Sequence, residues 1–199
     1  IVTADAQGAI LNGTSANDAS YKPSFQDIGK TITVRWTTDD PDGNGPCPVA
    51  TADASFNVNT PATAENAAGT DVCGLDASNL SVTTNNAGTW TVVTGGGTIS
   101  NPGSANGATY NPVAGDQGGT VTVRWTTDDP DGNGPCPIAT ADATFNVNTP
   151  ATASNATAGD ICGIFEDSPL SVTTNSTGQW TIVTADAQGA ILNGTSAND

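Results

Sequence analysis

The residues best suited to chemistry in this chain lie in one acidic string that occurs twice. The string DDPDGNGPC begins at Asp39 and again at Asp128. Oxygen ligands two residues apart, on a loop bent by glycine, can converge on a hard cation such as Ca²⁺. The string fits the first half of a calcium-loop pattern, although Thr51 stands where the bidentate Glu of that pattern would lie. One reading is therefore an irregular calcium site with these ligands: Asp39, Asp40, Asp42, Asn44, Asp128, Asp129, Asp131 and Asn133.

A second reading of the same string is a tight hairpin without a metal. Asp and Asn side chains accept hydrogen bonds from backbone amides two or more residues along the chain, and so hold turns together. Against this reading, the acidic and amide groups crowd into a few residues and repel one another unless a cation lies between them. Both readings stay open at the level of sequence.

The four cysteines form a second regular set. Cys47 and Cys136 are 89 residues apart, as are Cys73 and Cys162. Such spacing in an acidic chain rich in strand-forming residues is typical of a disulfide framework in an oxidising compartment. A structural zinc site is disfavoured, because the chain has no CxxC pair and no histidine.

Two pairings of the cysteines are considered. Joining Cys73 to Cys136 links residues 63 positions apart, which stabilises a small domain by about 4 kcal/mol in the chain-entropy account. Cys47 and Cys162 would then pair with neighbouring periods of a longer array. The alternative joins Cys47 to Cys73, and sequence alone does not exclude it.

Catalysis has little support in these residue types. Without histidine, a general base near neutral pH would have to be a carboxylate with a strongly shifted pKa. No Ser or Cys has a recognisable activating partner, and the adjacent Asp39 and Asp40 would point apart at a strand end. We therefore expect that the protein is not an enzyme.

The charge of the chain excludes two classes of partner. Four basic residues stand against twenty acidic ones, for a net charge of −16. Nucleic acids and anionic membrane surfaces are bound through clusters of Lys and Arg, which this chain does not have. The sequence also contains no apolar run long enough to span a membrane, so membrane insertion is not expected.

The chain is internally repetitive. Residues 1–18 are identical to residues 182–199, which gives a period of 181 residues, and residues 34–64 recur at 123–153 with two conservative changes. The predicted domains are the C-terminal part of a split repeat (1–60), one complete repeat (61–149) and the N-terminal part of the next repeat (150–199). Near-identical tandem units are typical of stalks, fibres and coats.

Alternating apolar and polar residues predict the strands. They fall at residues 31–38, 52–59, 80–84, 89–94, 108–110, 120–127, 139–148, 170–174 and 179–184. The pattern points Ile32, Val34 and Trp36 to one face, and Ala54, Phe56 and Val58 to another buried face. Arg35 would point outward. Six or seven such strands in about 90 residues indicate an all-β fold of tandem β-sandwiches.

Three further features favour an immunoglobulin-like sandwich. Trp90 and its counterpart Trp180 lie where such folds carry a core tryptophan. Asp27 and Asp116 begin matching turns that enter the next-to-last strand of a unit. The connection between units is short and contains Pro61 or Pro150, so it should be extended and stiff.

The string VTVRWTTDDPDGNGPCP followed by ATADATFNV, with a V/I-C-G entry and a W-bearing strand before it, resembles a known family. It is similar to the tandem immunoglobulin-like repeats of giant secreted surface proteins of Bacteroidota, which act as adhesins, gliding-motility filaments or surface fibres. The resemblance implies export to the cell surface, and it implies that a cysteine near the repeat start partners the cysteine of the acidic hairpin.

The leading functional prediction is a structural unit of an extracellular filament, stapled by disulfides and stiffened by calcium. Its main partner would be itself, as a continuous repeat chain or as subunits joined head to tail. The alternative is the stalk or the glycan- or protein-binding module of a surface adhesin. Surface glycosylation is a further prediction, at these N-x-[ST] sites: Asn12, Asn79, Asn155 and Asn175.

Overall fold

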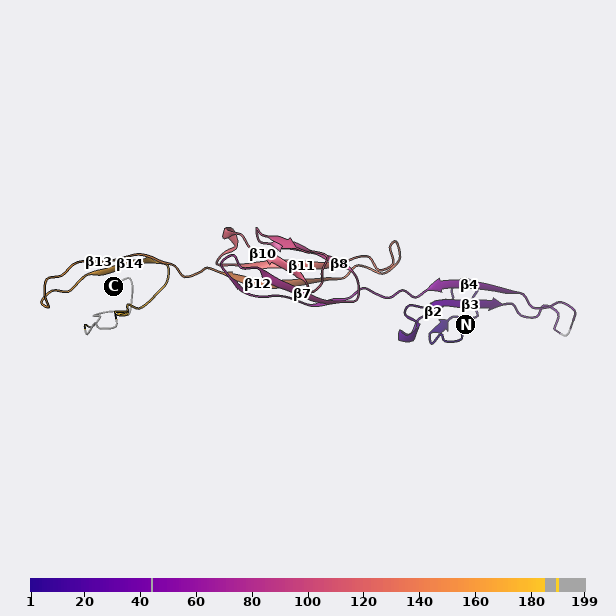
Figure 1. Cartoon of the computed structure of the whole chain (residues 1–199). Helices are drawn as coiled ribbons and strands as arrows, with labels where there is room; N and C mark the ends of the chain where they lie inside the picture. The colour runs from indigo at the N-terminus through magenta and orange to yellow at the C-terminus, as the bar shows by residue number, and fades with distance from the viewer. Residues whose placement is uncertain (44, 185–188, 190–199) are drawn as a thin grey trace.

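The computed structural model describes residues 1–43, 45–184 and 189, and these residues form three parts in a row (Figure 1). We call residues 1–60 the N-terminal half, residues 61–149 the central unit and residues 150–184 the C-terminal segment. The elements are strands apart from two single 3₁₀ turns, η1 (Phe25–Asp27) and η2 (Ala114–Asp116). The predicted all-β fold is confirmed.

The central unit consists of two four-stranded sheets. The first sheet has the order β5-β7-β10-β9, with β5 (Ala64–Gly69), β7 (Ser78–Thr84), β10 (Ala108–Asn111) and β9 (Thr98–Ser100). The second has the order β6-β12-β11-β8, with β6 (Val72–Cys73), β12 (Thr140–Asn148), β11 (Gly119–Thr127) and β8 (Gly88–Thr94). All pairings are antiparallel except β6 with β12, which run parallel. The unit thus has eight strands, one or two more than predicted.

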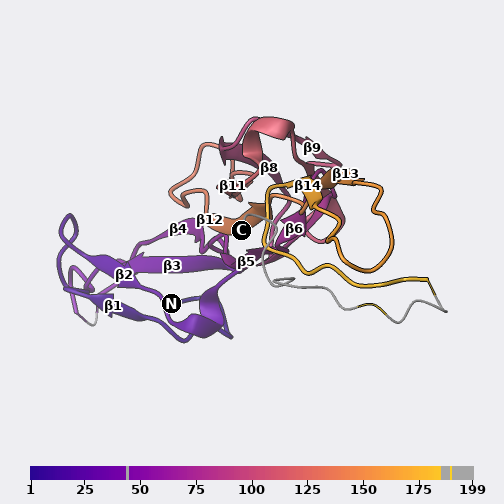
Figure 2. The same ribbon diagram turned by 90° about the vertical axis from the view of Figure 1, so that its left-hand side faces the viewer.

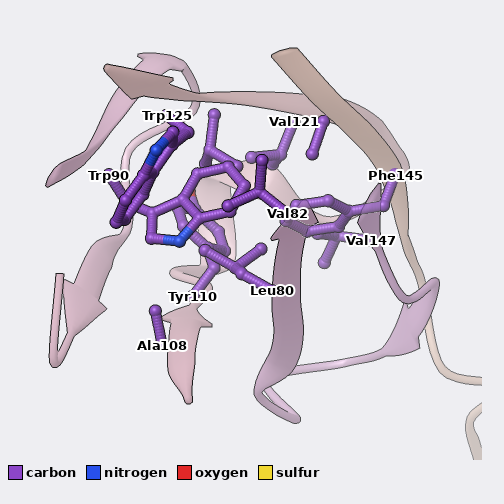
Figure 3. Close-up of a cluster of buried hydrophobic side chains, with 11 residues drawn as sticks. Leu80, Val82, Trp90, Ala108, Tyr110, Val121, Trp125, Phe145 and Val147 are labelled. Carbon is purple, nitrogen blue, oxygen red and sulfur yellow. The ribbon is translucent and has the colours of Figure 1, made fainter. Parts of the chain in front are cut away.

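The core of the central unit lies between its two sheets (Figure 3). Along β11 the residues alternate, with Val121, Val123 and Trp125 buried and their neighbours more exposed, as a strand with one wet face requires. Trp90 of β8 packs edge to face on Trp125, with ring centroids 5.6 Å apart. Eleven residues are buried in this core: Leu80, Val82, Trp90, Ala108, Tyr110, Val121, Val123, Trp125, Ala143, Phe145 and Val147.

The N-terminal half repeats only part of this plan. It contains two antiparallel hairpins, of which one pairs β1 (Ala9–Leu11) with β2 (Ser20–Lys22) and the other pairs β3 (Thr31–Thr37) with β4 (Thr51–Asn57). In Figures 1 and 2 the short hairpin lies along one side of the longer one. By sequence and register these four strands correspond to β9, β10, β11 and β12. The described residues of the half therefore hold no counterparts of β5, β6 and β7, and only residues 1–3 match the end of β8.

The prediction that the apolar face of the N-terminal half is buried is wrong for most of its residues. Trp36 is 40% exposed and Phe56 is 37% exposed, and Ala54 is exposed as well. In the central unit β5 packs on β12 and β11, and β8 lies beside β11. Residues 1–43 and 45–60 hold no strands in these positions. Ile32 is buried, as predicted.

The C-terminal segment holds β13 (Ala153–Ala158) and β14 (Leu170–Thr174), which pair antiparallel. The register of this pair matches that of β5 with β7, including an irregularity at the same place. The strand predicted at residues 179–184 is not formed. Its counterpart β8 is hydrogen bonded to β11, and the C-terminal segment contains no strand equivalent to β11.

The two outward-facing arginines are paired with aspartates on the neighbouring strands. Arg35 contacts Asp53 across β3 and β4, and Arg124 contacts Asp142 across β11 and β12, each with 2.6 Å between Nε and Oδ1. All four side chains are more than 40% exposed, so each pair is screened by solvent and contributes little to the stability of its sheet.

Candidate assembly interface

The acidic hairpin is held together by its own carboxylates. In the N-terminal half Asp42 Oδ2 accepts a hydrogen bond from the Cys47 N–H at 3.1 Å, and Asp40 Oδ1 accepts one from the Asp42 N–H at 3.2 Å. The central unit repeats both bonds with Asp131 in place of Asp42. These bonds are the ones expected for the tight hairpin that Asp side chains hold together through backbone amides.

In each hairpin two carboxylate oxygens accept backbone N–H groups, and Asp131 Oδ1 is buried without a hydrogen-bond partner. Within residues 1–43, 45–184 and 189, no three or more acidic or Cys side chains are grouped to hold one ion. Asp39 and Asp128 lie at the bases of the hairpins, and Asn133 is exposed at the tip of the second one. Asn44, its counterpart, lies outside the described residues. Calcium binding therefore stays a prediction.

One hairpin residue reaches the neighbouring part of the chain. Asn59, at the end of the N-terminal half, donates from Nδ2 to Asp131 Oδ2 at 2.7 Å. Partial burial raises the pKa of Asp131, but the hydrogen bonds from the Cys136 N–H and the Asn59 amide outweigh that effect and leave the pKa below its ordinary value. Asp131 is therefore an ionised acceptor at the junction of the two parts.

The linkers are fastened by a second asparagine. Asn85 Oδ1 accepts from the Thr63 N–H at 2.8 Å, and Asn85 Nδ2 donates to the Pro61 carbonyl at 3.0 Å. Asn175 makes the same two bonds to the linker that begins at Pro150. Side-chain bonds of this kind restrict the extended linkers.

The structure does not bring Cys73 and Cys136 together. All four cysteines lie in the described part of the chain, and none of them forms a disulfide. Cys73 lies opposite Asn148, at the end of β12, whereas Cys136 lies in the hairpin that precedes β12. At the usual rise per residue the length of β12 is about 26 Å, far beyond the reach of one disulfide. Cys47 and Cys73 are both free, so the alternative pairing is not formed either.

A tyrosine that the sequence reasoning did not single out fixes the turn into β11. Tyr110 Oη donates to Asp116 Oδ2 at 2.8 Å and accepts from the Gly97 N–H at 2.8 Å. Asp116 Oδ1 accepts from the Gly96 N–H at 2.7 Å. The matching Tyr six residues before Asp27 was the sequence signal that could have revealed this arrangement.

The N-terminal half repeats the arrangement with Tyr21 and Asp27, 2.9 Å apart. Hydrogen bonds from the N–H groups of Gln7 and Ser24 lower the pKa of Asp27 to about 2. Asp27 is fully buried, so the turn is formed in the N-terminal half even though the face beside it is open.

The open face of the N-terminal half is an apolar groove of about 440 Å³. Its floor is made by Val34, Trp36 and Phe56 of the long hairpin, and one wall by Ile10 and Tyr21 of the short one. A second groove, of about 280 Å³, runs along the edge of the same half at Asn57–Asn59 and reaches Pro130 of the central unit. Both grooves follow strands that have lost a neighbour relative to the central unit.

The C-terminal segment has an open apolar face as well. Ala153, Ala156, Val172 and Trp180 line a shallow groove of about 280 Å³ on it. Leu170 is 42% exposed, whereas its counterpart Leu80 in the central unit is 2% exposed. The chain therefore presents an uncovered apolar surface in each of its outer parts.

Comparisons with known proteins give no relative. No protein-family model, no curated protein and no solved structure matches the chain. In the part of the chain that the structure describes, no helix has the length and apolar character needed to cross a membrane.

Proposed function

We propose that this chain is a structural repeat of an extracellular filament or surface fibre, built from immunoglobulin-like β-sandwiches. The single observation that carries the proposal is the linear succession of repeated parts. Strands of one sequence type, related by an offset of 89 or 90 residues, follow one another along one line and are joined by short connections (Figure 1).

The hydrogen bonds at the junctions between parts support a structural role. The Asn59–Asp131 contact and the linker bonds of Asn85 restrict the angle between neighbouring parts. A fibre needs such restricted junctions, whereas independently moving binding modules are joined by flexible linkers. The immunoglobulin-like assignment is supported by the two packed sheets, by Trp90 in the core and by the Asp116 turn.

Electron microscopy of native material tests the proposal. A unit of this size is about 40 Å long, so a 181-residue period should advance about 80 Å when units stack end to end. A uniform filament with that axial repeat, or a shorter one from tilted packing, is the expected result. Short rods that do not polymerise would overturn it and indicate an adhesin stalk.

A further inference from the structure

The two open faces of the chain are complementary parts of one unit. We propose that residues 150–181 of a second copy of this chain dock on the N-terminal half and complete it as β5 to β8 complete the central unit. This inference rests on the proposed structural role and names the partner: another copy, joined head to tail. The central unit, in which both sheets are present, is the template of the completed interface.

The core of the template divides cleanly between the two faces. Of its eleven residues, eight have counterparts in the N-terminal half and three in the C-terminal segment. The first set is Ala19, Tyr21, Ile32, Val34, Trp36, Ala54, Phe56 and Val58. The second set is Leu170, Val172 and Trp180. Ten of the eleven are identical to the template, and Ile32 replaces Val121, so no core position is lost or made polar.

The exposed residues are those that docking would cover. Trp36 is 40% exposed and Trp125 only 1%, and Phe56 is 37% exposed against 2% for Phe145. In the docking segment, residues 150–181, Leu170 is 42% exposed, against 2% for Leu80. Docking would place Trp180 of the second copy on Trp36, in the edge-to-face contact that Trp90 makes with Trp125. Burial of these side chains is the driving force for association.

The backbone edge of the N-terminal half is also matched. In the central unit β6 lies parallel to the end of β12, and Asp71 accepts from the Asn146 N–H at 2.7 Å. The same residue types occur at Asp160 and Asn57, so residues 160–162 of the second copy fit beside the end of β4. The groove of about 280 Å³ at Asn57–Asn59 is where this strand would lie.

Two changes in the docking segment, residues 150–181, compensate each other. Pro169 replaces Asn79, whose N–H donates to Thr70 Oγ1 in the central unit. Gly159 replaces Thr70, so the donor and the acceptor of that hydrogen bond are lost together. The missing N–H of Pro169 therefore leaves no unsatisfied partner and does not weaken the docked strand.

One change fits less well. Gly69 packs on the ring of Phe145 so closely that a Cβ there would overlap the ring. Its counterpart is Ala158, whose methyl group would meet Phe56 in the completed unit. Phe56 must shift to accept it, and Ala158→Gly should strengthen the association.

In the N-terminal half, residues 1–3 already lie at one end of the position that β8 has in the central unit. There the Val2 N–H donates to the Thr33 carbonyl, and the Thr33 N–H donates to Thr3 Oγ1. The second bond matches the one from the Thr122 N–H to Thr94 Oγ1 in the central unit. Residues 178–181 of the second copy would therefore occupy the remainder of the β8 position, beside residues 1–3. Residues 182–199 duplicate residues 1–18 and are not needed for docking.

Docking has a covalent consequence at the junction. Cys73 lies opposite Asn148, so Cys162 of the second copy would lie opposite Asn59, one strand spacing of about 4.8 Å away. Asn59 contacts Asp131, which accepts from the Cys136 N–H. Cys136 and Cys162 of the second copy would thus lie at the same junction, and an S–S bond forms there, as two S–H bonds break, once their Cα atoms approach within about 7 Å. The two protons and two electrons pass to a low-molecular-weight disulfide, which is reduced to two thiols.

The association of the purified full chain tests the docking. Mass photometry over a wide range of concentration should show dimers and longer chains, because a head-to-tail contact leaves a free face at each end. Val172→Asp places a charge in the docked core and should abolish these species. Thr173→Asp is the matched control, since its counterpart Thr83 is exposed, and it should leave them unchanged. Deleting residues 182–199 should also leave them unchanged.

Cross-linking identifies the contact. A mixture of isotopically light and heavy chains is oxidised with oxidised glutathione, digested and analysed by mass spectrometry. A mixed light–heavy peptide joining Cys136 to Cys162 is expected, and Val172→Asp should remove it. A chain that stays monomeric at all concentrations, association unaffected by Val172→Asp, or cross-links only within one chain would each overturn the proposal.

The experiments distinguish a failure of this inference from a failure of the proposed function. A monomeric chain together with an 80 Å repeat in native filaments would remove the docking of a second copy but leave the structural role. Association in solution without any native filament would support the docking of a second copy but remove the structural role.

Discussion

The Asn59 amide donates to Asp131 Oδ2 at 2.7 Å and joins the last residues of the N-terminal half to the acidic hairpin of the central unit. Asp131 accepts the Cys136 N–H with the same oxygen. A hairpin that looks like an isolated loop in sequence therefore connects two successive parts of the chain.

Replacing Asn59 with Ala should loosen this junction. The variant loses one hydrogen bond to a charged acceptor, worth about 1.5–3 kcal/mol when well shielded and less at this half-buried site. We expect a broader distribution of end-to-end distances in small-angle X-ray scattering, with an unchanged unfolding midpoint of the central unit. Asn57→Ala, on the neighbouring strand position, is the control. Identical scattering from the variant and the parent chain would mean that the contact does not set the angle.

The Tyr110–Asp116 contact should be important for the stability of the central unit. Tyr110→Phe leaves the half-buried Gly97 N–H without its acceptor and removes a donor from the buried Asp116. An unsatisfied buried group costs about 1–3 kcal/mol, so the midpoint of denaturant unfolding should fall by a corresponding amount. Tyr21→Phe in the open half should have a smaller effect, because Tyr21 is only half-buried. Equal, negligible effects of both changes would contradict this role.

The low pKa of Asp27 makes the stability of the N-terminal half depend on pH. Hydrogen bonds from Gln7 and Ser24 N–H groups lower its pKa from 3.8 to about 2. A carboxyl whose pKa is lower when folded stabilises the fold above its unfolded pKa, and this contribution is lost as the pH falls through the folded pKa. Stability should therefore decline between about pH 4 and pH 2. Asp27→Asn should flatten this part of a stability–pH curve, and an unaltered slope would show that other carboxyls control it.

Calcium binding at the hairpins is checked by thermal unfolding. If the acidic string binds calcium, added Ca²⁺ should raise the midpoint and a chelator should reverse the rise, since a ligand that binds only the folded state stabilises it. Asp129→Asn together with Asp131→Asn should remove the response in the central unit. A midpoint that is the same with Ca²⁺ and with chelator would leave hydrogen bonds alone to hold the hairpin.

The periodic parts of the fold were predictable because local pattern and final environment agree there. Alternation along β11 and β12 gave their buried residues, and the Asp-Gly turns gave the entry to β11. The same alternation in β3 and β4 predicted burial that does not occur, because burial depends on strands that lie in another part of the sequence. A strand pattern states which face is apolar and not what covers it.

The candidate interface was predictable only in part for a related reason. Spacing identified the acidic strings and the cysteines, but pairing Cys73 with Cys136 assumed that both lie at one end of a unit. The parallel placement of β6 beside the end of β12 is a non-local feature without a sequence signal. It puts Cys73 at the opposite end, next to the following linker, where the Gly74 position lies close to Pro150.

The two equivalent tryptophans Trp36 and Trp125 offer a final comparison between an open and a closed unit. Trp125→Ala should destabilise the central unit by about 3–5 kcal/mol, because its side chain is 1% exposed and the variant leaves a cavity. Trp36→Ala in a dilute chain should cost less, since that side chain is 40% exposed. At concentrations where copies associate, the cost of Trp36→Ala should rise toward that of Trp125→Ala, because docking buries Trp36. Denaturant unfolding of both variants at low and high concentration measures this change. A difference between the variants that does not depend on concentration would show that Trp36 remains uncovered.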